Sequence, residues 1–155
     1  MGMIAFDFGK KVALLPDNGV SLFPATTLDT TGAAVVAILS RAFSPDIKNR
    51  FIHISDFTTS LEEVLSIVEE TLGGEQWTRI NVPMKDLFRQ SISNIESGIC
   101  TAQEFGGVLI PPFFGGIDVW AKEDNALLGL AKNKNLKDEV SSVAKSLSAR
   151  AKEQA

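Results

Sequence analysis

His53 and Cys100 are the only histidine and the only cysteine in this sequence, and neither has the neighbours that catalysis needs. A histidine acts as a general base when a second group orients its ring, and a cysteine attacks only as its thiolate. No orienting group is evident for His53, and no charged residue adjoins Cys100. We therefore expect a structural, half-buried histidine and a small buried cysteine, with catalytic residues unknown and no metal site.

Four aromatic residues are the best candidates for binding a substrate: Phe105, Phe113, Phe114 and Trp120. Pockets lined by aromatic rings hold flat organic molecules well, so the expected ligand is a small aromatic or apolar organic molecule. The same rings are equally suited to filling a hydrophobic core. The sequence alone leaves both interpretations open.

The sequence contains no glycine-rich turn of the kind that grips phosphates. Neither G-x-G-x-x-G nor G-x-x-x-x-G-K occurs, and the pair Gly115 and Gly116 does not lie between an expected strand and an expected helix. Such a turn surrounds a pyrophosphate with backbone N–H groups at a helix N-terminus. We therefore expect that this chain alone binds no NADP(H), and no residue is assigned to a cofactor.

Composition and charge narrow the class of protein. The chain has 155 residues, of which 45% are hydrophobic and 22% charged, as in one globular domain. A formal net charge of −4 without a basic stripe argues against a nucleic-acid partner. No apolar run is long enough to span a membrane, and no signal-peptide pattern begins the chain. These features, with a single cysteine, predict a cytoplasmic protein without a membrane partner.

The first half of the chain is predicted to be a small antiparallel meander followed by an apolar helix. Three short apolar runs fit strands: residues 3–8, 12–15 and 20–23. Asn18 and Gly19, between the last two runs, are typical of a tight hairpin turn. Thr26 and Thr27 are candidate N-caps for a helix over residues 33–43, and capping also explains the polar cluster around Asp29. That helix is apolar nearly all round, which predicts burial on more than one face.

The middle of the chain, residues 50–82, has the pattern of a strand, a helix and a strand. Residues 50–55 and 77–82 are the expected strands, and Ser60 with Glu63 has the spacing of a capping box. A connection of this length predicts that the two strands pair in parallel through a right-handed crossover. Apolar residues at steps of three and four give the helix one buried stripe: Leu61, Val64, Leu65, Val68 and Leu72.

The last third is expected to be mainly helical. One helix should follow Pro83 and end at Gly98, and an amphipathic helix should cover residues 136–147. Between them, a helix after Thr101 is weakened by the pair Gly106 and Gly107. The predicted fold class is therefore α/β over a single domain, with a meander, a partial parallel sheet with flanking helices and a C-terminal helical region.

Three segments resemble a known family in their order and spacing: residues 25–35, 49–58 and 124–130. They are similar to segments of fungal NmrA-like proteins of the isoflavone reductase group, within the atypical short-chain dehydrogenase/reductases. The resemblance spans most of this chain but covers only the C-terminal half of that family's fold.

The resemblance implies a function for the chain. In that family, the N-terminal half carries the NADP-binding turn and, in the reductases, a catalytic lysine, whereas the C-terminal half supplies the substrate pocket. No position of this sequence matches either the turn or the lysine. The resemblance thus implies the substrate-binding part of an NADP-dependent oxidoreductase, not redox-competent alone.

Two alternatives stay open at this stage. Some NmrA-like proteins are regulators, so the resemblance also allows a non-catalytic regulatory or protein-binding module. A stand-alone, cofactor-free isomerase or cyclase could use the aromatic cluster to position its substrate. The apolar helix over residues 33–43 predicts that a homo-oligomer or a partner chain covers its surface, whereas an isolated monomer would favour the stand-alone enzyme.

Overall fold

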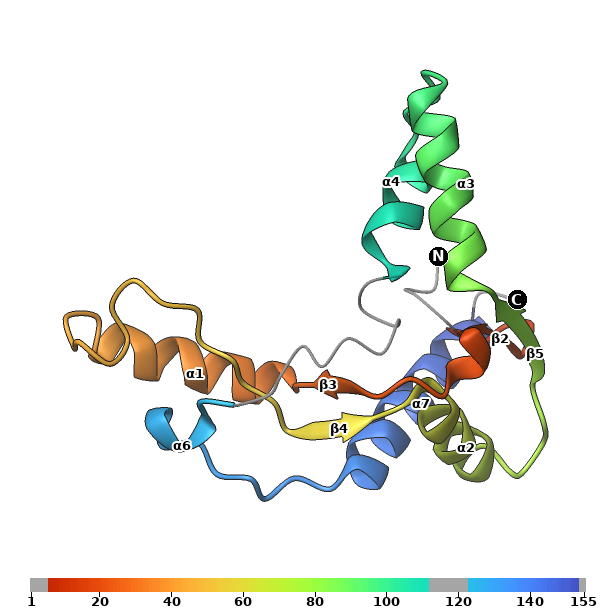
Figure 1. The fold of residues 1–155 in the computed structure, drawn as a ribbon. Helices are drawn as coiled ribbons and strands as arrows, with labels where there is room; N and C mark the ends of the chain where they lie inside the picture. Colours follow the sequence, from red (N-terminus) through yellow and green to blue (C-terminus); the bar gives the residue numbers. More distant parts are fainter. Residues whose placement is uncertain (1–5, 112–122, 154–155) are drawn as a thin grey trace.

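The computed structural model describes residues 6–111 and 123–153, which form a mixed α/β fold, as the sequence predicts (Figure 1). A three-stranded sheet has the order β1 (Phe6–Asp7), β2 (Val12–Pro16) and β5 (Thr78–Val82). Strand β1 is antiparallel to β2, and β5 is parallel to it. A separate antiparallel pair joins β3 (Phe23–Ala25) to β4 (Phe57–Thr59).

The predicted meander is only half right. Its first two strands pair as expected, but the third does not return to β2. Asn18 and Gly19 do adopt positive φ, as their sequence requires, within a 3₁₀ turn, η1 (Asp17–Gly19). The backbone N–H of Asn18 donates to Oδ1 of Asn81 at 2.8 Å, so the turn is fastened to β5. Because β5 occupies the free edge of β2, β3 pairs with β4 instead.

The predicted strand over residues 50–55 is also wrong, and with it the predicted pairing to residues 77–82. Residues 50–55 form no ladder with another strand, and the parallel partner of β5 is β2. The side chains of Asp124 and Asn125 take the backbone hydrogen bonds of this segment in place of a neighbouring strand. Strand β4 begins only at Phe57.

The helix starts follow their capping signals, although the first helix lies earlier in the chain than the predicted residues 33–43. Helix α1 (Leu28–Ser40) has Thr27 as its N-cap, and α2 (Leu61–Thr71) has Ser60, whose hydroxyl accepts from the N–H of Glu63. Gly73, at φ 105°, follows the end of α2. The other described helices are α3 (Met84–Glu96), α4 (Ala102–Leu109), α6 (Asn125–Leu128) and α7 (Leu136–Glu153).

The core lies where α2 and α7 cover one face of the three-stranded sheet. The buried side chains there come from β2, α2, α7 and the residue before β5: Ala13, Leu15, Leu61, Leu65, Val68, Trp77 and Ala144. The opposite face of the sheet leaves Leu14 and Ile80 partly exposed. A smaller cluster joins α1 to α6 through Ala34, Ile47 and Leu128. The main core therefore holds α2 and α7 in fixed positions.

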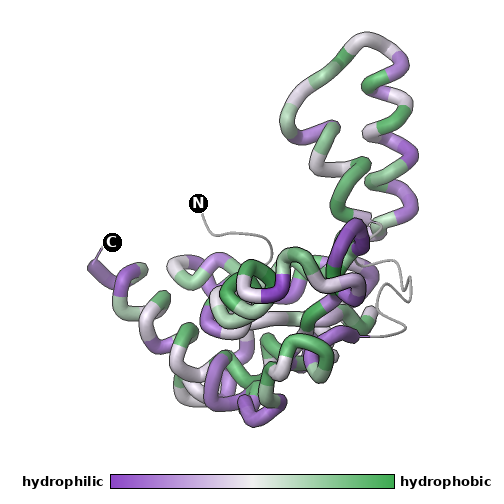
Figure 2. Tube along the Cα trace, turned by 90° about the vertical axis from the view of Figure 1, so that its left-hand side faces the viewer, coloured by the Kyte–Doolittle hydropathy of each residue, from purple (hydrophilic) through white to green (hydrophobic). Residues whose placement is uncertain are grey.

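Two parts of the chain project from this core. Figure 1 shows α1 with α6 extending to one side, and Figure 2 shows the α3–α4 hairpin standing away from the rest. Only one face of α1 is covered, so the predicted burial on several faces is not met within the described chain. No helix within residues 6–111 and 123–153 combines the length and the apolar composition needed to cross a bilayer.

Candidate functional site

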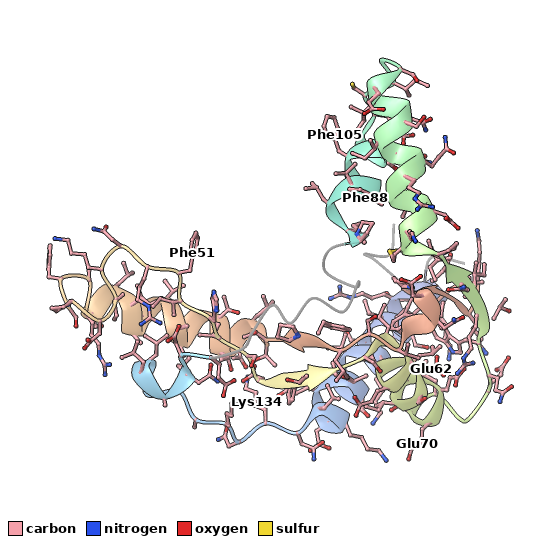
Figure 3. The ribbon with its side chains drawn as sticks, viewed as in Figure 1. Phe51, Glu62, Glu70, Phe88, Phe105 and Lys134 are labelled. Atoms are coloured by element: carbon pink, nitrogen blue, oxygen red, sulfur yellow. The ribbon has the colours of Figure 1, made fainter. Side chains whose placement is uncertain are left out.

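The predicted aromatic cluster can be placed only in part. Phe105 lies on α4 and is half-exposed, on the same projecting hairpin as Phe88 of α3 (Figure 3). The other members of the cluster lie outside the described residues: Phe113, Phe114 and Trp120. The assignment of these residues to a substrate site stays a prediction.

His53 and Cys100, which the sequence predicts to be structural, lie in different surroundings. His53 is half-buried as predicted, and its backbone N–H donates to Oδ2 of Asp124 at 3.0 Å. Cys100 is exposed, so its predicted burial is wrong. It lies in the turn between α3 and α4, at the far end of the hairpin, where no other described element packs (Figure 1). In the described part of the chain, no cluster of histidine, cysteine and acidic side chains is arranged to hold a metal.

An apolar pocket of about 500 Å³ lies between α2, α7 and the ends of β1 and β3. Figure 1 shows α2 and α7 side by side below the sheet. The apolar lining comes from positions far apart in the sequence and includes Phe6, Phe8, Phe57, Val64, Val140 and Leu147. The sequence indicates two of its walls, the apolar stripe with Val64 and the amphipathic helix over residues 136–147, but not that they pack around a pocket.

The rear of the pocket is part of the main core. Trp77 is buried and meets the rings of Phe6 and Phe8 edge to face, with centroids 6.1 and 5.0 Å away. The hydroxyl groups of Thr71 and Ser141 are 2.8 Å apart and link α2 to α7. These contacts keep the rear wall rigid, whereas Val143 and Leu147 are partly exposed at the entrance.

A carboxylate, Asp56, organises the start of α1 beside the pocket. It accepts from the N–H and hydroxyl of Thr27 at 2.8 and 2.9 Å and from the hydroxyl of Thr30 at 2.8 Å. Burial alone raises the pKa of Asp56, but these hydrogen bonds and the nearby Lys134 outweigh it, so the pKa is lowered. Asp56 is therefore ionised at neutral pH and acts as a structural anchor. Capping by Thr27 is confirmed, while Asp29 is exposed and lies 3.9 Å from Lys134.

A second carboxylate, Asp124, fastens the extended segment over residues 50–55. The N–H of His53 and the guanidinium of Arg50 both donate to it. The bond from His53 has the largest effect and, together with Arg50, lowers the pKa of Asp124, whereas burial opposes them. Asn125 completes the attachment by accepting from the N–H of Ser55 at 3.1 Å and donating to its carbonyl at 2.7 Å. Because these groups hold each other, the arrangement is suited to structure and not to proton transfer.

The same contacts bring together the three segments on which the family resemblance rests. Thr27 belongs to the first segment, Asp56 and Ser55 to the second, and Asn125 to the third. The hydroxyl of Ser55 also donates to Glu123 at 2.8 Å, and Glu123 pairs with Lys132. Hydrogen bonds from Lys132 and then Ser55 lower the pKa of Glu123, with burial opposing them. The three segments that carry the resemblance are therefore joined by one connected set of hydrogen bonds.

Comparison with known proteins relates the chain distantly to an oxidoreductase. It is 28% identical over 98 residues to oxidoreductase poxI of Penicillium oxalicum, and equally so to the protein of that name from strain 114-2 of the same species. The matched segment is 63% of this chain and spans only 30% of the length of these curated relatives. No family model matches the chain, and no solved structure does.

Proposed function

We propose that this chain is the substrate-binding part of an NADP-dependent, NmrA-like or isoflavone reductase-like oxidoreductase. The observation that carries the proposal is the similarity over 98 residues to oxidoreductase poxI. The matched segment spans 30% of the length of that protein. In this proposal the chain holds a small aromatic or apolar substrate, and hydride transfer needs a nucleotide-binding part as well. Phe105 and the neighbouring predicted aromatic residues are the proposed contacts of that substrate.

Within the described residues, the charges at the helix N-termini support the proposal that this chain alone does not hold the dinucleotide. An N-terminus attracts a phosphate through its unpaired N–H groups and its partial positive charge. Helices α1, α2, α3, α4 and α7 each carry an acidic side chain in the first turn, namely Asp29, Glu62, Asp86, Glu104 and Asp138. These carboxylates satisfy the partial positive charge and repel a pyrophosphate.

The uncovered side of α1 supports the need for a further part. Three apolar side chains on this side of α1 are half-exposed or more: Val35, Val36 and Leu39. Two apolar residues beyond the end of the helix, Phe43 and Phe51, are almost fully exposed. Exposed apolar side chains grouped on one helix and next to its end are typical of an interaction site. We propose that the nucleotide-binding part covers this surface, which we call the α1 face.

The genomic sequence upstream of the codon for Met1 provides the test. The proposal predicts an in-frame glycine-rich turn there, and a longer polypeptide that includes it should bind and oxidise NADPH. An upstream region without such a turn, or a longer polypeptide that does not bind NADPH, would contradict the proposal.

The α1 face also favours a second candidate function, a non-catalytic protein-binding or regulatory module. In that case the protein bound at the α1 face would contain no nucleotide site, and the complex would not oxidise NADPH. Purifying the natural complex and assaying it for NADPH binding distinguishes the two functions.

A further inference from the structure

We propose that the pocket between α2 and α7 is a binding site for a neutral or cationic organic molecule with a long apolar body. Its volume of about 500 Å³ lies within the range of about 300 to 1,000 Å³ that is typical of small-molecule sites. None of the described residues that line it lies on α3 or α4, so the pocket is separate from Phe105. The described residues that line it all belong to this chain, so ligand binding can be tested without a nucleotide-binding part.

The lining determines the apolar body of the ligand. Val68 and Ala144 are buried at the floor, while Val143 and Leu147 are partly exposed at the entrance. A ligand that covers the entrance residues removes their apolar surface from water, which favours binding roughly in proportion to the area covered, by about 25 cal/mol per Å². The floor needs no rearrangement, because it is already part of the main core.

The rim determines the polar end of the ligand. Among the described residues of the lining, the charged side chains are Asp29 and Glu139, both carboxylates. The hydroxyl of Thr26 donates to the carbonyl of Ile54 at 3.0 Å, and that of Thr27 donates to Asp56. The hydroxyl oxygen of Thr27 accepts from Nζ of Lys134, which also lies 3.9 Å from Oδ2 of Asp29. The rim therefore offers two acceptors to a ligand, the hydroxyl oxygen of Thr26 and the carboxylate of Glu139. A hydroxyl or an ammonium group fits these acceptors. Lys134 offsets the charge of Asp29, so it is Glu139 that leaves the rim with a net negative charge and repels a ligand carboxylate.

Fluorescence titration of the full chain with N-phenylnaphthylamine, a neutral apolar probe, tests the proposal. We expect a saturable rise in probe emission that dodecanol and dodecylamine reverse and that dodecanoate reverses far less. An unsaturable rise, or displacement by dodecanoate at the same concentration as dodecanol, would overturn the proposal.

Two matched valine substitutions locate the probe. Val143 on α7 lines the pocket and is 56% exposed, whereas Val36 on α1 is 65% exposed and lies outside the lining. Val143→Glu puts a charge in an apolar entrance and should weaken probe binding by about tenfold or more, while Val36→Glu should change it by less than about twofold. Equal loss in both folded variants would mean that the probe binds exposed apolar surface in general, and the proposal would fail.

A measurement on the unsubstituted chain covers the case in which Val143→Glu does not fold. Addition of dodecanol should shift the backbone amide resonances of Val64 and Val140, which line the pocket, and leave that of Phe88 on α3 in place. Shifts concentrated on the α3–α4 hairpin would overturn the proposal.

Discussion

Asp124 and Asn125 give residues 50–55 the hydrogen bonds that a neighbouring strand would otherwise provide. Asn125 bonds to both the N–H and the carbonyl of Ser55, and Asp124 accepts from the N–H of His53. The backbone N–H of Asp124 returns a bond to the carbonyl of His53 at 2.6 Å. A buried backbone group without a partner costs about 1 to 3 kcal/mol. The hydrogen bonds from Asp124 and Asn125 therefore contribute substantially to the local stability.

Replacing Asp56 with asparagine should destabilise the fold by about 1 to 2 kcal/mol, because the hydrogen bonds from Thr27 and Thr30 lose their charged acceptor. Urea unfolding at about pH 7 measures the change. Asp46→Asn alters an exposed aspartate in the loop after α1 and is the control, with an expected change within about 0.5 kcal/mol. Equal losses in the two variants would contradict the anchoring role of Asp56.

The pH dependence of the stability difference between the wild type and Asp56→Asn provides a separate prediction. The folded-state pKa of Asp56 is lowered, so its contribution to stability is complete above the pKa of an unfolded aspartate, about 3.9. That contribution is lost as the pH falls through the folded-state pKa. The stability gap between wild type and Asp56→Asn should be constant from about pH 7 to about pH 5 and shrink below about pH 4. A gap that widens in acid would contradict the account.

Among the elements, the α3–α4 hairpin depends on one close approach. A Cβ added to Gly107 would lie 2.0 Å from Oγ of Ser91, whereas one added to Gly106 would be 3.8 Å from the nearest side chain, Ile110. Both glycines lower the helix propensity of α4, but packing requires a glycine only at position 107. Gly107 lets α3 and α4 pack closely, and Gly106 makes no such contact.

Gly107→Ala should therefore destabilise the hairpin by about 1 to 3 kcal/mol, the usual cost of overpacking. Gly106→Ala should instead stabilise it by about 0.5 to 1 kcal/mol, since alanine favours the helix interior. Amide hydrogen exchange in α3 and α4 measures both effects locally. Similar exchange rates in the two variants would mean that the hairpin does not pack as described.

The N-caps of α1 and α2 and the end of α2 could be predicted from the sequence, but the strand partners could not. Thr27, Ser60 and Gly73 act on groups within a few residues, so their effect is visible in the local sequence. The parallel pairing of β2 with β5 joins segments more than sixty residues apart. The partners of residues 50–55 are side chains about seventy residues away, which no periodicity indicates.

The candidate site was harder to predict than the fold because it depends on contacts between residues far apart in the sequence. The predicted cluster from Phe105 to Trp120 is local in sequence, and only Phe105 lies among the described residues. The observed pocket is assembled from side chains between Phe6 and Leu147. Its formation depends on how α7 packs against α2, which apolar spacing alone does not specify.

At the scale of the whole molecule, the described chain leaves two apolar surfaces open: the α1 face and the pocket between α2 and α7. Figure 1 shows α1 projecting from the core, with β3 and β4 connecting it to the three-stranded sheet. A helix exposed in this way gains stability when another polypeptide covers it. The isolated chain should therefore self-associate.

Leu39→Glu on the α1 face should shift the isolated chain towards a monomer in light scattering, because a charge opposes burial of that face. Leu109→Glu on α4 is the matched control, since Leu39 is 70% exposed and Leu109 is 62% exposed. The control variant should associate as the wild type does. A wild-type chain that is monomeric at all concentrations would contradict the role assigned to the α1 face.

Calorimetric titration of the isolated chain with NADPH tests the central claim most directly, namely that this chain holds a substrate and not the dinucleotide. With acidic side chains at the start of its longer helices and no glycine-rich turn, the chain should give no saturable heat up to about millimolar NADPH. A dissociation constant of about ten micromolar or below, about −7 kcal/mol or stronger, would show that the polypeptide binds the cofactor unaided and would contradict the account.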